Sequence, residues 1–205
     1  MAENKNNDPQ IVITERPDWI SFDDIHQLLY AAHASTREKG ININTASMDA
    51  KALQEHIGES GQCFVALDGD KLVGTISVRI IERDTHYMHG KVTDPVLLGV
   101  LPEYRGKHIS TLLFERVIRF AEEHTGVIEG RVAEENLHMQ EILVKWCYQY
   151  VDFLSFKNTD HYTVVLYKWF PECPHSKLWL KLRYLLKKAY IKLRFKPGKI
   201  KRFGI

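Results

Sequence analysis

Residues 105–110 combine the residue types and the spacing that bind a phosphate group. An apolar run precedes them at residues 96–101 and predicts a buried strand, because it is too short for a helix. An amphipathic helix follows them, so unpaired amides and the positive end of the helix dipole face the turn. Arg105 and Lys107 add full positive charges, and Gly106 lets the backbone approach a phosphate closely. A strand, a basic turn and a helix N-terminus in this order fit an anion-binding site, although most turns of this kind bind no ligand.

The helix after this turn is predicted by its two faces. Apolar residues recur at helical spacing on one side, and charged residues occupy the other. Gly126 stands where the C-cap of this helix is expected. The apolar positions are Ile109, Leu112, Leu113, Val117, Phe120 and Ala121, and the charged positions are Glu115, Arg116, Arg119 and Glu122.

Around the turn, the chain reads Val100-x-Pro102-x-Tyr104-Arg105-Gly106-Lys107-x-Ile109. This stretch resembles the acetyl-CoA-binding motif of the GNAT N-acetyltransferase superfamily, whose loop reads Arg/Gln-x-x-Gly-x-Gly/Ala and whose amides hold the pyrophosphate of CoA. Arg105 matches the first position of that loop. His108 and Ser110 stand at the two later positions, where the family has small residues, and His108 adds a Cβ atom there. The resemblance covers residues 11–170.

The resemblance implies that acetyl-CoA is the co-substrate, and no metal is expected. It implies that the sheet splays beside residues 96–101, where the pantetheine arm pairs with the backbone like an added strand. The pyrophosphate would then sit on residues 105–110. Asn136 can cap the helix that follows it, contact the pantetheine arm, or do both. The expected cofactor-binding residues are Leu98, Gly99, Val100, Arg105, Gly106, Lys107, His108, Ile109, Ser110 and Asn136.

The reaction that the resemblance implies is direct transfer of an acetyl group to a primary amine of an unidentified acceptor, either a small molecule or a lipid-linked amine. A base must take a proton from the ammonium form of the acceptor. Glu134 and Glu135 are the candidates, because the end of the predicted strand at residues 127–133 places them beside the expected cleft. The family often has a Tyr seven residues after the Asn, as the acid that protonates the leaving thiolate. This chain has Leu143 there. A thiol pKa near ~8.5 makes the thiolate a tolerable leaving group without that acid.

The alternative is a non-catalytic acyl-CoA-binding module that docks on a membrane or a partner protein. Leu143 and His108 favour this alternative, because both depart from the family's pattern. The segment from Val100 to Gly106 fits both interpretations equally well.

The remaining pattern predicts one α/β (α+β) domain at residues 11–170, with a mixed, mostly antiparallel, twisted sheet flanked by helices. Ser21 and Asp24 form a capping-box pattern before a helix, and Asp68-Gly69-Asp70 is typical of a hairpin. The two-helix region near the N-terminus either lines the acceptor side or only covers the sheet. Further strands are expected at residues 11–14, 63–67, 72–81, 151–156 and 161–169, and further helices at 49–57 and after 136. Loops are expected at 41–47 and 82–94, and the second of these holds His86 and His89 as solvated side chains.

Composition places the chain among ordinary soluble globular proteins, with 44% hydrophobic and 26% charged residues. No apolar run is long enough to span a membrane, and we expect no signal peptide. Cys63, Cys147 and Cys173 form no CxxC pair, which favours reduced thiols and a cytoplasmic location. Residues 1–10 are polar and are expected to be disordered.

Residues 171–205 form a basic extension that contains 11 of the 28 Lys and Arg residues and one of the 26 Asp and Glu residues. Their pattern predicts an amphipathic helix with cations along both flanks. Residues 176–203 have three possible partners: the inner face of an anionic membrane, as in a peripheral protein, the domain itself, or another macromolecule. Of the last class, a protein is favoured over RNA or another nucleic acid. The apolar face consists of Leu178, Leu182, Leu185, Leu186, Ala189 and Leu193, and Leu180, Tyr184 and Ile191 interrupt the polar face.

Overall fold

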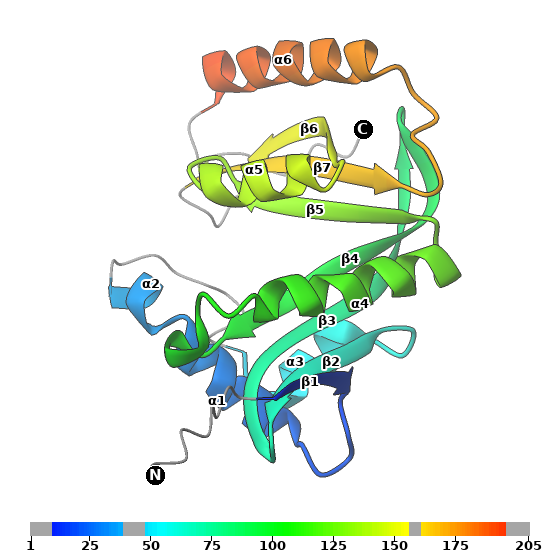
Figure 1. The fold of residues 1–205 in the computed structure, drawn as a ribbon. Coiled ribbons are helices and arrows are strands. Elements are labelled where there is room, and N and C mark those ends of the chain that lie inside the picture. The colour runs from blue at the N-terminus through cyan, green and yellow to red at the C-terminus, as the bar shows by residue number, and fades with distance from the viewer. Residues whose placement is uncertain (1–9, 39–47, 156–160, 196–205) are drawn as a thin grey trace, which may run out of the picture. The chain divides into compact units, whose positions relative to one another are not determined.

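The computed structural model describes residues 10–38, 48–155 and 161–195. Their strands form one sheet in the order β1-β2-β3-β4-β5-β7-β6 (Figure 1). The pairs β1–β2, β2–β3, β5–β7 and β6–β7 are antiparallel, and β4–β5 is parallel. The expected mixed, mostly antiparallel sheet is therefore confirmed. The loop expected at 41–47, the disorder expected at 1–9 and the basic end at 196–205 lie outside the described residues.

Outside residues 82–94, the bounds of most elements agree closely with the sequence pattern. The strands are β1 (Ile11–Glu15), β2 (Gln62–Asp68), β3 (Lys71–Thr85), β4 (Met88–Val100), β5 (Val127–Ala133), β6 (Gln149–Ser155) and β7 (Tyr162–Trp169). The helices are α1 (Phe22–Ala32), α2 (Ala34–Glu38), α3 (Ala50–Ile57), α4 (Ile109–His124), α5 (Leu137–Lys145) and α6 (Lys177–Arg194), with a 3-10 helix at Pro102–Tyr104.

Contacts divide the chain into two compact units, which are described separately. Unit 1 contains Met1–Arg79 and Pro95–Arg119, and unit 2 contains Ile80–Asp94 and Phe120–Ile205. The strands β3 and β4 and the helix α4 contribute residues to both units.

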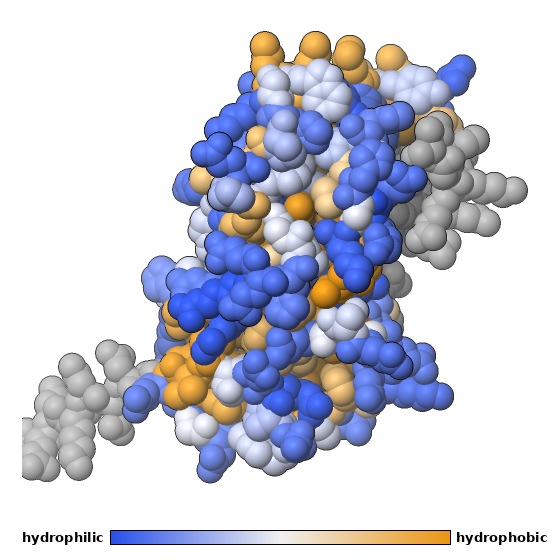
Figure 2. Space-filling model, turned by 90° about the vertical axis from the view of Figure 1, so that its right-hand side faces the viewer, coloured by the Kyte–Doolittle hydropathy of each residue, from blue (hydrophilic) through white to orange (hydrophobic). Residues whose placement is uncertain are grey.

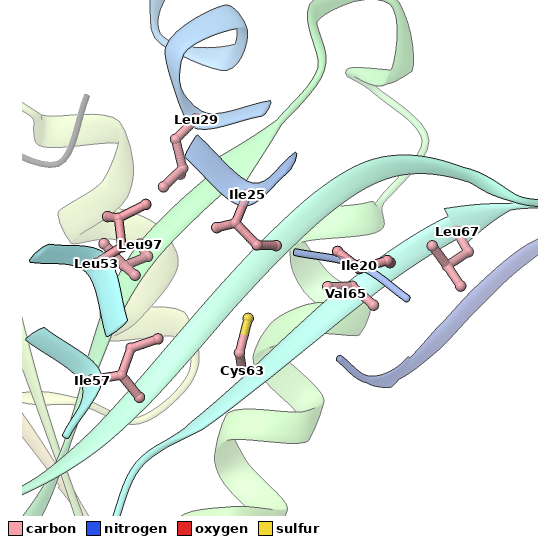
Figure 3. Close-up of a cluster of buried hydrophobic side chains, with 9 residues drawn as sticks. All are labelled: Ile20, Ile25, Leu29, Leu53, Ile57, Cys63, Val65, Leu67 and Leu97. Atoms are coloured by element: carbon pink, nitrogen blue, oxygen red, sulfur yellow. The ribbon is translucent and has the colours of Figure 1, made fainter. Parts of the chain in front are cut away.

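The core of unit 1 lies between α1, α3 and the sheet (Figure 3). The predicted capping box begins α1, because the Ser21 hydroxyl accepts from the Asp24 amide and the Asp24 carboxylate accepts from the Ser21 amide. Asp49 is the N-cap of α3, and its side chain accepts a single hydrogen bond from the amide of Ala52. Both helices then turn their apolar faces inward. The buried cluster consists of Ile20, Ile25, Leu29, Leu53, Ile57, Cys63, Val65, Leu67 and Leu97.

Gly99 allows α1 to approach β4 closely. A Cβ atom at this position would lie 3.0 Å from a methyl group of Leu29 and 3.2 Å from the Cβ of Ala32. Any larger side chain would therefore push the last turn of α1 away from the strand. The close approach places the C-terminal end of α1 beside the turn that follows β4.

The polar segment at 82–94 is not a loop, and that prediction was wrong. Its residues extend β3 to Thr85 and begin β4 at Met88. In β3, the exposed Glu82 and Asp84 stand on either side of the half-buried Arg83, as the alternation of side chains along a strand requires. A strand with one solvated face carries many polar residues, so its composition resembles that of a loop.

Unit 2 has a second core, in which aromatic residues of the sheet pack beneath α6. Tyr184 of α6 lies 5.0 Å from the ring of Tyr150 and 6.1 Å from that of Phe153, measured between centroids. The buried cluster of this unit consists of Tyr87, Val92, Val127, Val151, Val165, Tyr167, Trp169 and Leu180.

The expected C-cap of α4 is confirmed, because the Gly126 amide donates to the carbonyl of Ala121.

The predicted C-terminal helix is confirmed as α6, and the sequence had left open which of its faces is buried. Leu180 and Tyr184, which interrupt the polar face in the sequence, are the buried residues. The leucine face is exposed, so it does not pack against the domain. Among the described residues, no helix is long and apolar enough to cross a membrane.

Candidate functional site

The turn between β4 and α4 has the backbone conformation that an anion-binding loop needs. Gly106 has φ of 80° and His108 has φ of 58°, so both lie in the left-handed region. Left-handed residues within a turn make successive amides converge on one concave surface. The carbonyl of His108 accepts from the Leu112 amide and starts α4, which leaves the first-turn amides without helical partners. The Cβ of His108 has therefore not prevented the turn from forming.

The strand before this turn presents backbone groups on the side away from β3. The Leu101 amide donates 3.0 Å to the carbonyl of Val73 on β3. Because neighbouring residues of a strand point their hydrogen-bonding groups to opposite sides, those of Leu98 and Val100 point away from β3. Leu97 has φ of 55° and interrupts the strand just before them. Leu98 and Val100 are the two residues expected to pair with the pantetheine arm.

His33, the residue after α1, contacts this part of the strand. Its Nε2 atom lies 3.0 Å from the carbonyl oxygen of Leu98. Burial lowers the pKa of His33, the bond to Leu98 opposes that effect, and the nearby charges of Arg105 and Arg37 lower the pKa further. The net direction is downward, so the neutral ring is favoured at neutral pH.

Arg105 and Tyr104 hold the turn against the rest of unit 1. An Arg105 nitrogen donates 2.7 Å to the carbonyl of Ala32 at the end of α1. The Tyr104 hydroxyl donates 2.7 Å to the carboxylate of Asp68 at the end of β2. Lys107 lies with its Nζ atom 4.9 Å from the centre of the Tyr104 ring. Arg105 is exposed and has five N–H donors in all, so donors remain for an anion.

One cavity of about 260 Å³ joins these groups in unit 1. All of the predicted cofactor-binding residues line it except Lys107 and Asn136. Sequence reasoning missed Ala32, His33 and Tyr104, which complete the lining. Tyr104 stood within the motif, but nothing in the pattern indicated that α1 would end beside the turn. The lining residues are Ala32, His33, Leu98, Gly99, Val100, Tyr104, Arg105, Gly106, His108, Ile109 and Ser110.

A second cavity of about 260 Å³ lies elsewhere in unit 1, near the end of α3. It is lined in part by Arg16, Gln54 and Cys63, and it contains none of the predicted site residues. Burial raises the pKa of the Cys63 thiol, although hydrogen bonds from Ser77 and Thr75 and the charge of Arg16 oppose this. The thiol is therefore a poor nucleophile, and we assign the functional site to the cavity beside the turn.

Asn136 and Leu143 lie in unit 2, at the N-cap of α5 and within this helix. The Asn136 side chain accepts from the Met139 amide at 3.1 Å, so it is the N-cap of the helix. Leu143 is buried and would contact a Cβ atom at Gly130 at 3.1 Å. It therefore fills space between the helix and β5. Both positions have a structural role that needs no ligand.

The two candidate bases differ in their surroundings. Glu134 lies 2.8 Å from the ammonium groups of both Lys188 and Lys192 on α6. Burial raises its pKa, but the hydrogen bonds and charges of the two lysines outweigh burial, and the net pKa is lowered. A carboxylate with a lowered pKa is a weak base. Glu135 is exposed, and its role as a base stays a prediction.

Comparison with known proteins identifies the class. The sequence pattern of the Acetyltransferase (GNAT) family matches residues 23–147, which is more than half of the chain. The chain therefore belongs to the GNAT acetyltransferase family. No curated protein matches the chain significantly in sequence.

Solved structures with the same fold share little sequence with this chain. Arabidopsis thaliana NAA60 in complex with a bisubstrate analogue has 15% identity and a TM-score of 0.56, with 77% of this chain and 98% of that chain covered. A GNAT acetyltransferase from Streptococcus agalactiae 2603 has 16% identity and a TM-score of 0.61, with 79% and 96% covered. Arabidopsis thaliana NAA60 in complex with acetyl-CoA has 14% identity and a TM-score of 0.55, with 79% and 99% covered.

Proposed function

We propose that this protein transfers an acetyl group from acetyl-CoA directly to a primary amine. The observation that carries the proposal is the cavity beside the turn, where left-handed Gly106 and His108 make the amides converge beside Arg105. Converging amides, a helix N-terminus and a guanidinium together favour a diphosphate. Complexes of Arabidopsis thaliana NAA60, which has the same fold, with acetyl-CoA and with a bisubstrate analogue support this choice of co-substrate.

The backbone beside the cavity gives the reaction its geometry. Leu98 and Val100 would hold the pantetheine arm along the strand, and residues 105–110 would hold the pyrophosphate. The amine nitrogen, after losing a proton to a base, attacks the thioester carbonyl carbon. The N–C bond forms, the C–S bond breaks, and CoA leaves as a thiolate that takes up a proton. The thiol pKa of ~8.5 allows that departure without the acid that Leu143 replaces.

The acceptor would be a small-molecule or a lipid-linked amine, and Glu135 is the candidate base that carries no ion pair with any residue the structure describes. The alternative, a non-catalytic acyl-CoA-binding module, is not favoured by any comparison. An assay of free-thiol release from acetyl-CoA over a panel of primary amines tests both. We expect release that depends on the amine and exceeds slow hydrolysis.

Two variants test whether the release of thiol depends on the proposed diphosphate site. Arg105→Glu should lower amine-dependent release at least about tenfold when acetyl-CoA is below saturation, because it reverses the charge next to the proposed diphosphate. Arg119→Glu makes the same change at an exposed position further along α4 and should release thiol at the wild-type rate. Tight binding of acetyl-CoA without amine-dependent release by the wild type, across the whole panel, would support the non-catalytic alternative instead.

A further inference from the structure

The outer face of α6 is the largest group of exposed leucines in unit 2. Leu178, Leu182, Leu185, Leu186 and Leu193 are between 50% and 87% exposed. Figure 2 shows hydrophobic side chains along this outer side of the helix, at the top of the view. Exposed apolar patches of this kind mark sites that contact a lipid surface or another protein.

The contacts of the inner face prevent the helix from turning these leucines inward. Leu180 and Tyr184 are buried, and Lys187 lies 2.6 Å from the carboxylate of Asp152. Lys188 and Lys192 share Glu134. A surface helix usually buries its apolar face and solvates its charges. In α6 the lysines on the inner face bind acidic residues of unit 2, and the leucines are held outward.

Contacts in the middle of the helix and at its C-terminal end hold it in the same orientation. Arg183 donates to the carbonyl of Val151, and its guanidinium lies 4.4 Å from the centre of the Tyr87 ring. Beyond the C-terminal end, the Tyr162 hydroxyl donates 2.6 Å to the carbonyl of Phe195. The exposed leucines therefore form one fixed surface along the helix.

The charges beside the leucines indicate which partner this surface fits. Residues 177–194 contain no Asp or Glu. Lys177 and Lys181 flank the leucines on one edge, are exposed, and make no ion pair with any residue that the structure describes. A second copy of α6 would bring like charges together, whereas an anionic surface would neutralise them. Trp179 and Tyr190, on the other edge, have the amphipathic rings that favour a headgroup region.

We propose that α6 lies in the interface of an anionic lipid bilayer. The outward leucines enter the acyl-chain boundary, and the cations of the flanking edge contact the headgroups. This proposal is independent of the acetyl transfer proposed above, because it involves no residue of the cavity in unit 1.

Flotation of the full-length protein with vesicles tests the proposal. Vesicles of phosphatidylglycerol and phosphatidylcholine should bind the protein, and vesicles of phosphatidylcholine alone should bind it more weakly. The double variant Leu182→Ser and Leu186→Ser should lower binding by more than about tenfold, the factor that corresponds to losing one buried leucine side chain. Lys181→Ala should lower it by about fivefold, which corresponds to ~1 kcal/mol for one cation near the surface.

The matched control is the double variant Leu137→Ser and Val144→Ser on α5, where the same kinds of side chain are exposed in the same unit. It should bind anionic vesicles as the wild type does. Deleting α6 is not an equivalent test, since it would uncover the aromatic residues beneath Tyr184. Failure of the wild type to bind anionic vesicles, or unchanged binding by the α6 variant, would overturn the proposal. A wild-type dimer that the α6 variant converts to a monomer would show that a second copy covers this face instead.

Discussion

The Nε2 atom of His33 lies 3.0 Å from the carbonyl oxygen of Leu98. Because a carbonyl oxygen only accepts hydrogen bonds, Nε2 carries the proton and donates. The contact ties the end of α1 to the strand residue that precedes the turn. A residue at the end of α1 therefore helps to fix the backbone on which the thioester is proposed to lie.

Replacing His33 tests this positioning role. His33→Ala should raise KM for acetyl-CoA by about fivefold, because one neutral hydrogen bond contributes ~1 kcal/mol. His33→Gln keeps an N–H donor of similar reach and should recover part of the loss. Steady-state kinetics of thiol release measure both. A KM that is the same in His33→Ala and the wild type would show that the contact does not position the strand.

Substitutions at His108 distinguish the role of its backbone from the role of its imidazole ring. If the amides bind the diphosphate, His108→Gly should retain wild-type affinity for acetyl-CoA, since Gly adopts the same left-handed conformation. Its stability should stay within about 1 kcal/mol of the wild type, because relief of backbone strain and the entropy of the unfolded Gly offset each other. Calorimetry and thermal unfolding provide the two readings.

The opposite substitution at this position should disrupt the turn. His108→Val introduces a β-branched residue at positive φ and should destabilise the protein by ~1–2 kcal/mol. It should also weaken the binding of acetyl-CoA, because the turn no longer holds its amides in place. If His108→Gly lost affinity for acetyl-CoA as strongly as His108→Val, the imidazole ring would be the binding group, and the proposed role of the amides would be incorrect.

The ion pairs of Glu134 should make the attachment of α6 depend on pH. Its pKa is lowered in the folded state by Lys188 and Lys192. The stability that Glu134 contributes is therefore fully present above the unfolded pKa of ~4.3 and is lost as the pH falls through the lower folded pKa. Glu134→Gln should reduce the free energy of unfolding by about 1 kcal/mol near neutral pH, since the lysines are partly exposed.

Denaturant unfolding across the acidic range measures this prediction. The difference between Glu134→Gln and the wild type should disappear as the pH falls, because the wild-type carboxylate becomes protonated. Glu135→Gln changes the exposed neighbour and serves as the control, with stability close to that of the wild type throughout. A constant difference between Glu134→Gln and the wild type from neutral to acidic pH would contradict the assignment.

Much of the fold could be predicted because local signals and burial agree. The capping box at Ser21, the hairpin at Asp68 and the C-cap at Gly126 each use only residues close in sequence, and all three are confirmed. The turn at 105–110 also depends on neighbouring residues. The residues of the turn that line the cavity were therefore predictable. The positive φ of Leu97 was not, because no residue type near it in the sequence indicates a left-handed backbone.

Features that depend on distant residues could not be predicted. The sequence pattern of α6 does not reveal Asp152 and Glu134 as partners for its lysines, and these ion pairs decide which face is buried. Similarly, His33 enters the site only because α1 approaches β4 at Gly99. In both cases the deciding contact joins segments far apart in the chain, so periodicity alone leaves the orientation open.

The central claim is that the turn around Gly106 binds the diphosphate of acetyl-CoA. Calorimetric titration of acetyl-CoA into the wild type, Arg105→Glu and the control Arg119→Glu tests it most directly. We predict binding by the wild type and the control, and affinity at least about tenfold weaker for Arg105→Glu, as expected for loss of a hydrogen bond to a charged group. Equal affinity of Arg105→Glu and the wild type, or no binding by the wild type, would contradict the claim.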